Sequence, residues 1–97
     1  MVRFVVLLDY TQQGISRIAD TLSRADGFAK AAQKAGVSIQ SQYWTSGGHD
    51  GILVLEATDE QSVQALILRL GIEGNMRSQM LRAFDRSDMQ AILAKAH

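Results

Sequence analysis

The feature that most constrains this chain is a run of five apolar residues, Phe4-Val5-Val6-Leu7-Leu8. A short continuous apolar run is typical of a strand that is buried on both faces of its sheet. One layer of helices covers only one face, and 97 residues suffice for one domain but not for two. We therefore expect a single domain over residues 1–97 whose second sheet face meets another subunit.

The composition excludes several classes of partner. Ten basic residues balance ten acidic ones, so the sequence shows no electrostatic footprint for nucleic acid or for an anionic membrane surface. No apolar run approaches the roughly 20 residues of a membrane span. Hydrophobic residues make up 46% of the chain, which is typical of a folded globular protein. These features predict a mature, soluble, cytoplasmic protein.

Cysteine is absent, which excludes disulfides, thiolate metal sites and cysteine nucleophiles. The two histidines, His49 and His97, are far apart in the sequence and show no metal-ligand spacing. The paired glycines Gly47-Gly48 open no helix and are followed by no Lys-Ser/Thr, so they are not a phosphate loop. The sequence therefore predicts no metal and no cofactor.

The apolar periodicity predicts an alternation of strands and helices. A helical region over 15–35 has two parts, with a bend expected at Gly27 and an end at Gly36. Two strands, 37–45 and 52–57, are joined by a short hairpin connection. In the first of them Val37, Ile39 and Tyr43 are expected on one face, and Trp44 on the polar face.

The second half of the chain is predicted to hold two helices and one strand. Capping boxes at 58–61 and 87–90 precede helical stripes over 63–70 and 89–96. Residues 75–84 suit either a helical face or a strand, and Gly71 and Gly74 in front of them favour the strand. The resulting order is the α+β, ferredoxin-like βαββαβ sandwich, which has a four-stranded antiparallel sheet and here gains a short C-terminal helix.

A series of short motifs in this order resembles the GYD-domain family, small bacterial and archaeal proteins of the dimeric α/β-barrel type. They are Asp9-Tyr10-Thr11, Gly14-Ile15, Arg24-Ala25 ahead of Phe28, Tyr43-Trp44-Thr45, Gly48-His49-Asp50, Gly74-Asn75-Met76-Arg77 and Leu81-Arg82-Ala83-Phe84. The tyrosine of the family's Gly-Tyr-Asp triplet is His49 here, an imidazole that titrates near neutral pH. The resemblance implies the fold and a homodimer, but no particular reaction.

The hairpin holds the residues that first suggest a site. His49 is either a ligand contact at the mouth of the sheet or a solvated tip residue, and Asp50 is expected to bind backbone donors of its own turn. Adjacent strand residues point to opposite faces, so these two are not expected to form a dyad. Tyr43 and Trp44 suit a pocket wall and a subunit interface equally well.

Strand ends supply the other candidates, Tyr10 and Arg77. An arginine in a partly buried strand needs a partner. Arg77 and Arg82 therefore either pair with an aspartate such as Asp9 across the sheet or clamp a carboxylate ligand.

The leading hypothesis is a small-molecule-binding or regulatory domain that forms a homo-oligomer through its sheet. Its tentative ligand-binding residues are Tyr10, Tyr43, Trp44, His49 and Arg77. One alternative is a cofactor-free enzyme, monooxygenase- or isomerase-like, of the dimeric α/β-barrel type, for which the sequence names no catalytic residue. The other is a purely structural subunit, which would be favoured if the aromatic residues were fully packed with no cavity near the hairpin.

Overall fold

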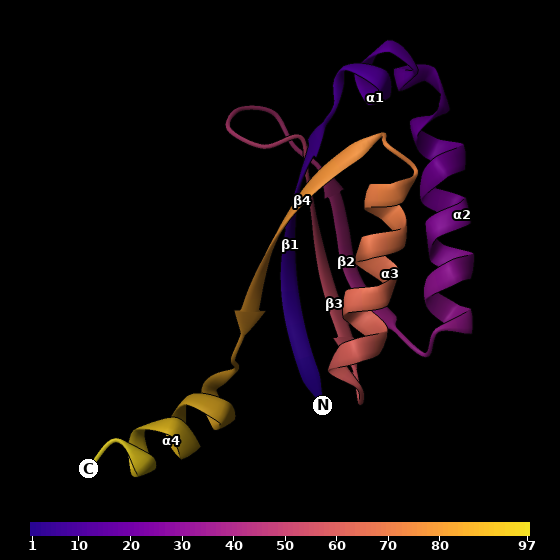
Figure 1. The fold of residues 1–97 in the computed structure, drawn as a ribbon. Coiled ribbons are helices and arrows are strands. Elements are labelled where there is room, and N and C mark those ends of the chain that lie inside the picture. Colours follow the sequence, from indigo (N-terminus) through magenta and orange to yellow (C-terminus); the bar gives the residue numbers. More distant parts are fainter.

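The computed structural model describes residues 1–97 and places two long helices on one face of a four-stranded sheet (Figure 1). The elements are β1 (Val2–Tyr10), α1 (Gln12–Ser16), the 3₁₀ turn η1 (Ile18–Asp20), α2 (Thr21–Lys34), β2 (Ser38–Trp44), β3 (Gly51–Ala57), α3 (Glu60–Ile72), β4 (Met76–Ala83) and α4 (Arg86–Lys95). None of the helices is both long enough and apolar enough to span a bilayer.

The strand order is β2-β3-β1-β4, and every neighbouring pair is antiparallel. β1 therefore occupies a central position, with Val6 opposite Leu53 of β3 on one side and Met80 of β4 on the other. This topology confirms the predicted α+β, ferredoxin-like arrangement. It also confirms that residues 75–84 form a strand rather than a helix.

The core lies between the sheet and the helices α2 and α3. Alternate residues of β1 (Phe4, Val6 and Leu8) are buried under the helices, and α3 contributes Val63 and Ile67 from its predicted apolar stripe. Burying each such side chain stabilises the fold by about 1.5–3 kcal/mol. Removing one of them would therefore cost a large share of the stability of so small a domain.

The opposite face of the sheet is covered by no helix of this chain (Figure 1). Val5 and Leu7 point to this open face and are half-buried, whereas their neighbours in β1 are buried. The continuous apolar run is thus divided between a core face and an open face. The expectation that a second subunit covers the open face stays a prediction.

A bulge in β2 changes which side chains face the helices. The register shifts between Ile39 and Ser41, so the alternation of the strand is inverted beyond that point. Ile39 pairs with Leu55 on the helix face, but Tyr43 now pairs with Ile52 on the open face. The prediction that Tyr43 shares a face with Ile39 is therefore wrong, and Trp44 is turned toward the helices.

Both predicted capping boxes lie close to the true helix starts but at the wrong residues. Asp59, not Thr58, caps α3, because its carboxylate accepts from the Gln61 N–H and aspartate is the stronger capping residue. In α4 the box joins Asp85 and Asp88. The Asp88 N–H lowers the pKa of the Asp85 carboxyl, as does the nearby Arg3 guanidinium.

The helical region after β1 breaks earlier than predicted. The break falls at Arg17, between α1 and η1, and α2 runs without interruption through Gly27, so the expected bend there is wrong. Gly36 has a φ of 73° and ends α2 as predicted, because glycine adopts this left-handed conformation without steric cost.

The C-terminal helix α4 projects away from the rest of the molecule (Figure 1). None of its residues is buried, although Met89, Ile92 and Leu93 form the predicted apolar stripe. An amphipathic helix gains most of its stability by packing that stripe. This helix therefore has an apolar surface that its own chain leaves exposed.

Glycine substitutions test the close contact between α1 and the start of β4. A Cβ at Gly14 would overlap the carbonyl oxygen of Asn75, whereas a Cβ at Gly27 would meet nothing within 4 Å. We expect Gly14→Ala to lower the free energy of unfolding by about 1–3 kcal/mol through overpacking. Gly27→Ala, the matched control inside a helix, should raise it by about 0.5–1 kcal/mol. Urea denaturation measures both, and an unchanged Gly14→Ala variant would contradict the contact.

Candidate functional site

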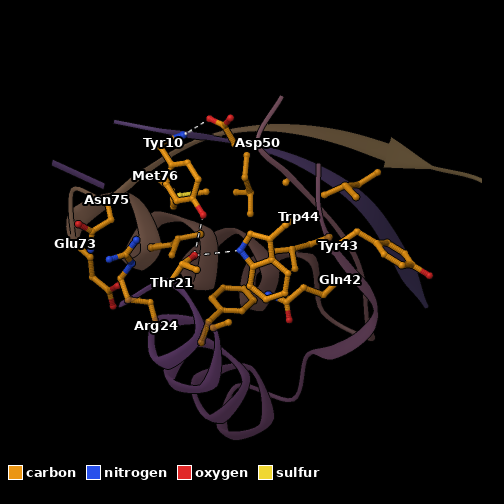
Figure 2. A pocket seen from close by; sticks show the side chains of 17 residues that line it. Tyr10, Thr21, Arg24, Gln42, Tyr43, Trp44, Asp50, Glu73, Asn75 and Met76 are labelled. Carbon is orange, nitrogen blue, oxygen red and sulfur yellow. Dashed lines mark hydrogen bonds between the residues drawn. The ribbon is translucent and has the colours of Figure 1, made fainter. Parts of the chain in front are cut away.

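A cavity opens between the sheet and the helices at the end where β1 stops and α2 begins (Figure 2). Its volume is about 60 Å³, and 17 residues line it, ten of them hydrophobic. A single water needs only about 10–15 Å³, so the cavity has room for a small organic molecule but not for a drug-sized one. Its apolar wall comprises Leu8, Phe28, Leu53, Leu70 and Met76, among others.

Three polar side chains from three different elements meet at one point of the cavity. The hydroxyl of Thr21, at the start of α2, lies 2.8 Å from the hydroxyl of Tyr10 and 3.1 Å from Nε1 of Trp44 (Figure 2). Tyr10 closes β1 and Trp44 closes β2, so both strands end beside the first turn of the helix. We call Tyr10, Thr21 and Trp44 the hydroxyl cluster.

A second polar group lines the cavity on the side of α3. The Arg24 guanidinium donates to the carbonyl of Arg17 at 2.9 Å, which holds α2 against the turn before it. Asn75 is only 8% exposed, and its Oδ1 accepts from Gln13 Nε2 at 2.9 Å. Glu73 completes this side of the wall.

Asp50 fixes the hairpin to the end of β1. Its carboxylate accepts from the Tyr10 N–H at 2.9 Å, and its own N–H donates to the Leu8 carbonyl at 2.8 Å. The expectation that Asp50 serves its own turn is therefore wrong: Thr45 does so, through a hydrogen bond from its hydroxyl to the His49 carbonyl. Asp50 instead holds the backbone of Tyr10 in place, and with it the Tyr10 ring.

His49 lies outside the cavity. Its Nδ1 is 3.3 Å from a carboxylate oxygen of Asp9, whose side chain belongs to the open face of β1. As expected, His49 forms no dyad with Asp50. Its partner is an aspartate 40 positions earlier, which sequence adjacency could not indicate.

The other two candidates also belong to the open face. Tyr43 is 64% exposed, and its ring points away from the cavity, although the residue forms part of the wall (Figure 2). Arg77 lies opposite Asp9 in the sheet register, but the Asp9 carboxylate contacts His49 instead. The cross-sheet pair is made instead by Arg3, whose Nε donates to Glu56 at 2.9 Å.

The Arg82 guanidinium interacts with aromatic rings and backbone carbonyls, not with an aspartate. Its guanidinium lies over the rings of Phe84, at 4.8 Å, and Phe4, at 5.7 Å, and it donates to the carbonyls of Ala83 and Arg3. Such cation–π contacts contribute about 0.5–1 kcal/mol at exposed sites. No carboxylate clamp is formed by Arg77 and Arg82 together.

Of the five predicted binding residues, Tyr10 and Trp44 have their side chains at the cavity. The side chains of Tyr43, His49 and Arg77 lie on the open face of the sheet or beside it. Thr21 and Arg24 are polar residues of the cavity wall that sequence reasoning missed. Thr21 stands in no motif, so no sequence signal marked it. Arg24 stood in one of the motifs that carry the family resemblance, which was the available signal.

Comparison with known proteins confirms the family resemblance. The family model described as GYD domain matches residues 4–93. The crystal structure of TTHA0845 from Thermus thermophilus has a similar fold, with a TM-score of 0.54 and 18% sequence identity over 88% of this chain and 95% of that chain. At this identity the likeness shows the fold alone. No curated protein matches the sequence.

Substitution of Asp50 tests its role as the anchor of the site. Asp50→Ala leaves the Tyr10 N–H without its charged acceptor, and we expect the free energy of unfolding to fall by about 1–2 kcal/mol. The emission of Trp44, the single tryptophan, should shift as the hairpin loosens. The exposed Asp26 on α2 supplies the control, since Asp26→Ala should change stability by less than about 0.5 kcal/mol. Equal effects of the two substitutions in urea denaturation would contradict the anchoring role.

Proposed function

This chain belongs to the GYD-domain family, and from that premise we propose that it is a small-molecule-binding domain that assembles as a homodimer through the open face of its sheet. The observation that carries the binding proposal is the cavity beside Trp44. It is concave and mostly apolar, and it holds a few convergent polar groups, which is the usual composition of a ligand site.

The cavity also weighs against a purely structural role. In a structural subunit the aromatic residues at the end of β2 would be packed without free space beside them. Here Trp44 is 48% exposed and borders a cavity of about 60 Å³. The histidine that first suggested proton-transfer chemistry, His49, lies outside the cavity against Asp9.

The open face supports the proposal of a homodimer. Five apolar side chains from three neighbouring strands lie together on it: Val5, Leu7, Ile52, Val54 and Leu81. Contiguous apolar surface of this kind is rare on monomers and marks an interaction site. The Arg3–Glu56 ion pair and the Asp9–His49 contact lie at opposite ends of the patch. An apolar centre with polar ends is typical of a protein interface.

A cavity-filling substitution tests the binding proposal. Ala25 lines the cavity from α2, and Ala29 lies one turn further along the same helix with an exposed side chain. We expect Ala25→Leu to abolish the binding of one-ring fragments by occupying their space, while Ala29→Leu leaves binding unchanged. The indole N–H resonance of Trp44, the single tryptophan, reports fragment binding in ¹⁵N-labelled protein.

The same measurement contains the result that would overturn the binding proposal. If no fragment of a broad one-ring set moves the Trp44 resonance of the unmodified protein, the cavity is not a ligand site. If the fragments bind Ala25→Leu as well as they bind the unmodified protein, they bind elsewhere.

The oligomeric state tests the second half of the proposal. Light scattering should give twice the 10.6 kDa mass of the chain at micromolar concentration. Val54→Asp places a charge at the centre of the open face, and we expect it to yield a folded monomer, since an unpaired buried charge costs several kcal/mol. Gln64→Asp on the exposed face of α3 is the control and should stay dimeric. A monomeric unmodified protein would refute the homodimer.

A further inference from the structure

The hydroxyl cluster holds more hydrogen-bond donors than its own bonds use. Tyr10, Thr21 and Trp44 carry one donor hydrogen each, which makes three. Only two hydrogen bonds join them, and both involve the Thr21 hydroxyl. One donor hydrogen of the cluster is therefore left without an acceptor inside the protein.

The geometry limits where this surplus hydrogen resides. The Trp44 N–H can only donate, and it is used on Thr21. If Tyr10 donates to Thr21, the free hydrogen is on the Thr21 hydroxyl. If Thr21 donates to Tyr10, it is on the Tyr10 hydroxyl. In both arrangements a rotatable hydroxyl that lines the cavity is ready to donate to an occupant.

Asn75 also borders the cavity, but its Oδ1 accepts from Gln13, outside the hydroxyl cluster. The surplus hydrogen of the hydroxyl cluster is therefore the donor on which the inference rests. Its complementary ligand presents an acceptor oxygen.

The charges of the wall decide whether that oxygen is anionic. Asp50 and Glu73 contribute two negative charges and Arg24 contributes one positive charge. An anion would enter a mostly apolar site whose ionised groups are negative on balance, which is unfavourable. An uncharged acceptor avoids this repulsion and still uses the free donor.

We propose that the cavity binds a small uncharged carbonyl compound of one-ring size, whose oxygen accepts the surplus hydrogen of the Tyr10–Thr21 hydroxyl pair. The proposal rests on the proposed binding function and names its ligand class. The apolar part of the ligand packs against Phe28, Trp44 and Leu70 of the cavity wall. The cavity, of about 60 Å³, is open on one side, so part of a one-ring ligand seated in it can extend past the rim.

Three probes of one size separate the chemical alternatives. Acetophenone carries the carbonyl, ethylbenzene has a similar shape without it, and benzoate carries an anionic group instead. The Trp44 indole N–H resonance measures the dissociation constant of each. The quantity compared between variants is the ratio of the ethylbenzene constant to the acetophenone constant, because this ratio cancels changes in general cavity packing.

The donor count makes an unusual prediction for Tyr10→Phe and Thr21→Val. Tyr10→Phe leaves a free hydrogen on Thr21. Thr21→Val frees the Tyr10 hydroxyl, and its new methyl group blocks the Trp44 N–H. Each single variant should therefore keep the ratio within about twofold of the unmodified value. The double variant has no rotatable hydroxyl left, so the ratio should fall about tenfold, equivalent to about 1.4 kcal/mol.

Each outcome decides something different. A tenfold fall in the double variant alone, with benzoate binding more weakly than acetophenone, supports the proposal. An unchanged ratio in the double variant overturns the donor inference, and tighter binding of benzoate overturns the uncharged class. If acetophenone does not bind while other fragments move the Trp44 resonance and Ala25→Leu blocks them, this inference fails and the binding function stands. Since both substitutions are nearly isosteric, circular dichroism should show an unchanged fold.

Discussion

The rest of the structure depends on the central position of β1. Its two edges are paired with β3 and β4, and its helix-facing residues, Phe4, Val6 and Leu8, are the middle of the core. Tyr10, the last residue of this strand, lies in the cavity wall. The hydrogen bond from the Tyr10 N–H to the Asp50 carboxylate joins that end to the hairpin. Core, hairpin and cavity are therefore all positioned by one strand.

The two faces of the sheet carry different kinds of side chain. The helix face holds the core and, beside the strand ends, the cavity with its hydroxyl cluster. The open face holds apolar side chains between the Arg3–Glu56 ion pair and the Asp9–His49 contact. His49, where this chain differs from the Gly-Tyr-Asp triplet of its family, belongs to this face because it contacts Asp9. Its imidazole is thus a surface group of the open face and does not reach the cavity.

The errors in the sequence-based predictions have local physical causes. The capping residues were misplaced by one or two positions because Thr58, Asp59, Asp85 and Ser87 are all competent caps, and only the backbone geometry selects among them. Tyr43 and Trp44 were assigned to the wrong faces because one bulged residue inverts the alternation of a strand. Nothing in the order of residues 38–44 marks the bulge.

What the sequence determined by itself was the succession of elements. The apolar run of β1 and the apolar stripe of α3 follow from local periodicity, and periodicity is a property that neighbouring residues carry. The tertiary structure alone decided which side chains meet. Thr21 joins Tyr10 and Trp44 only because a helix start is packed against two strand ends. Such contacts between distant segments depend on packing and register, which no local pattern encodes.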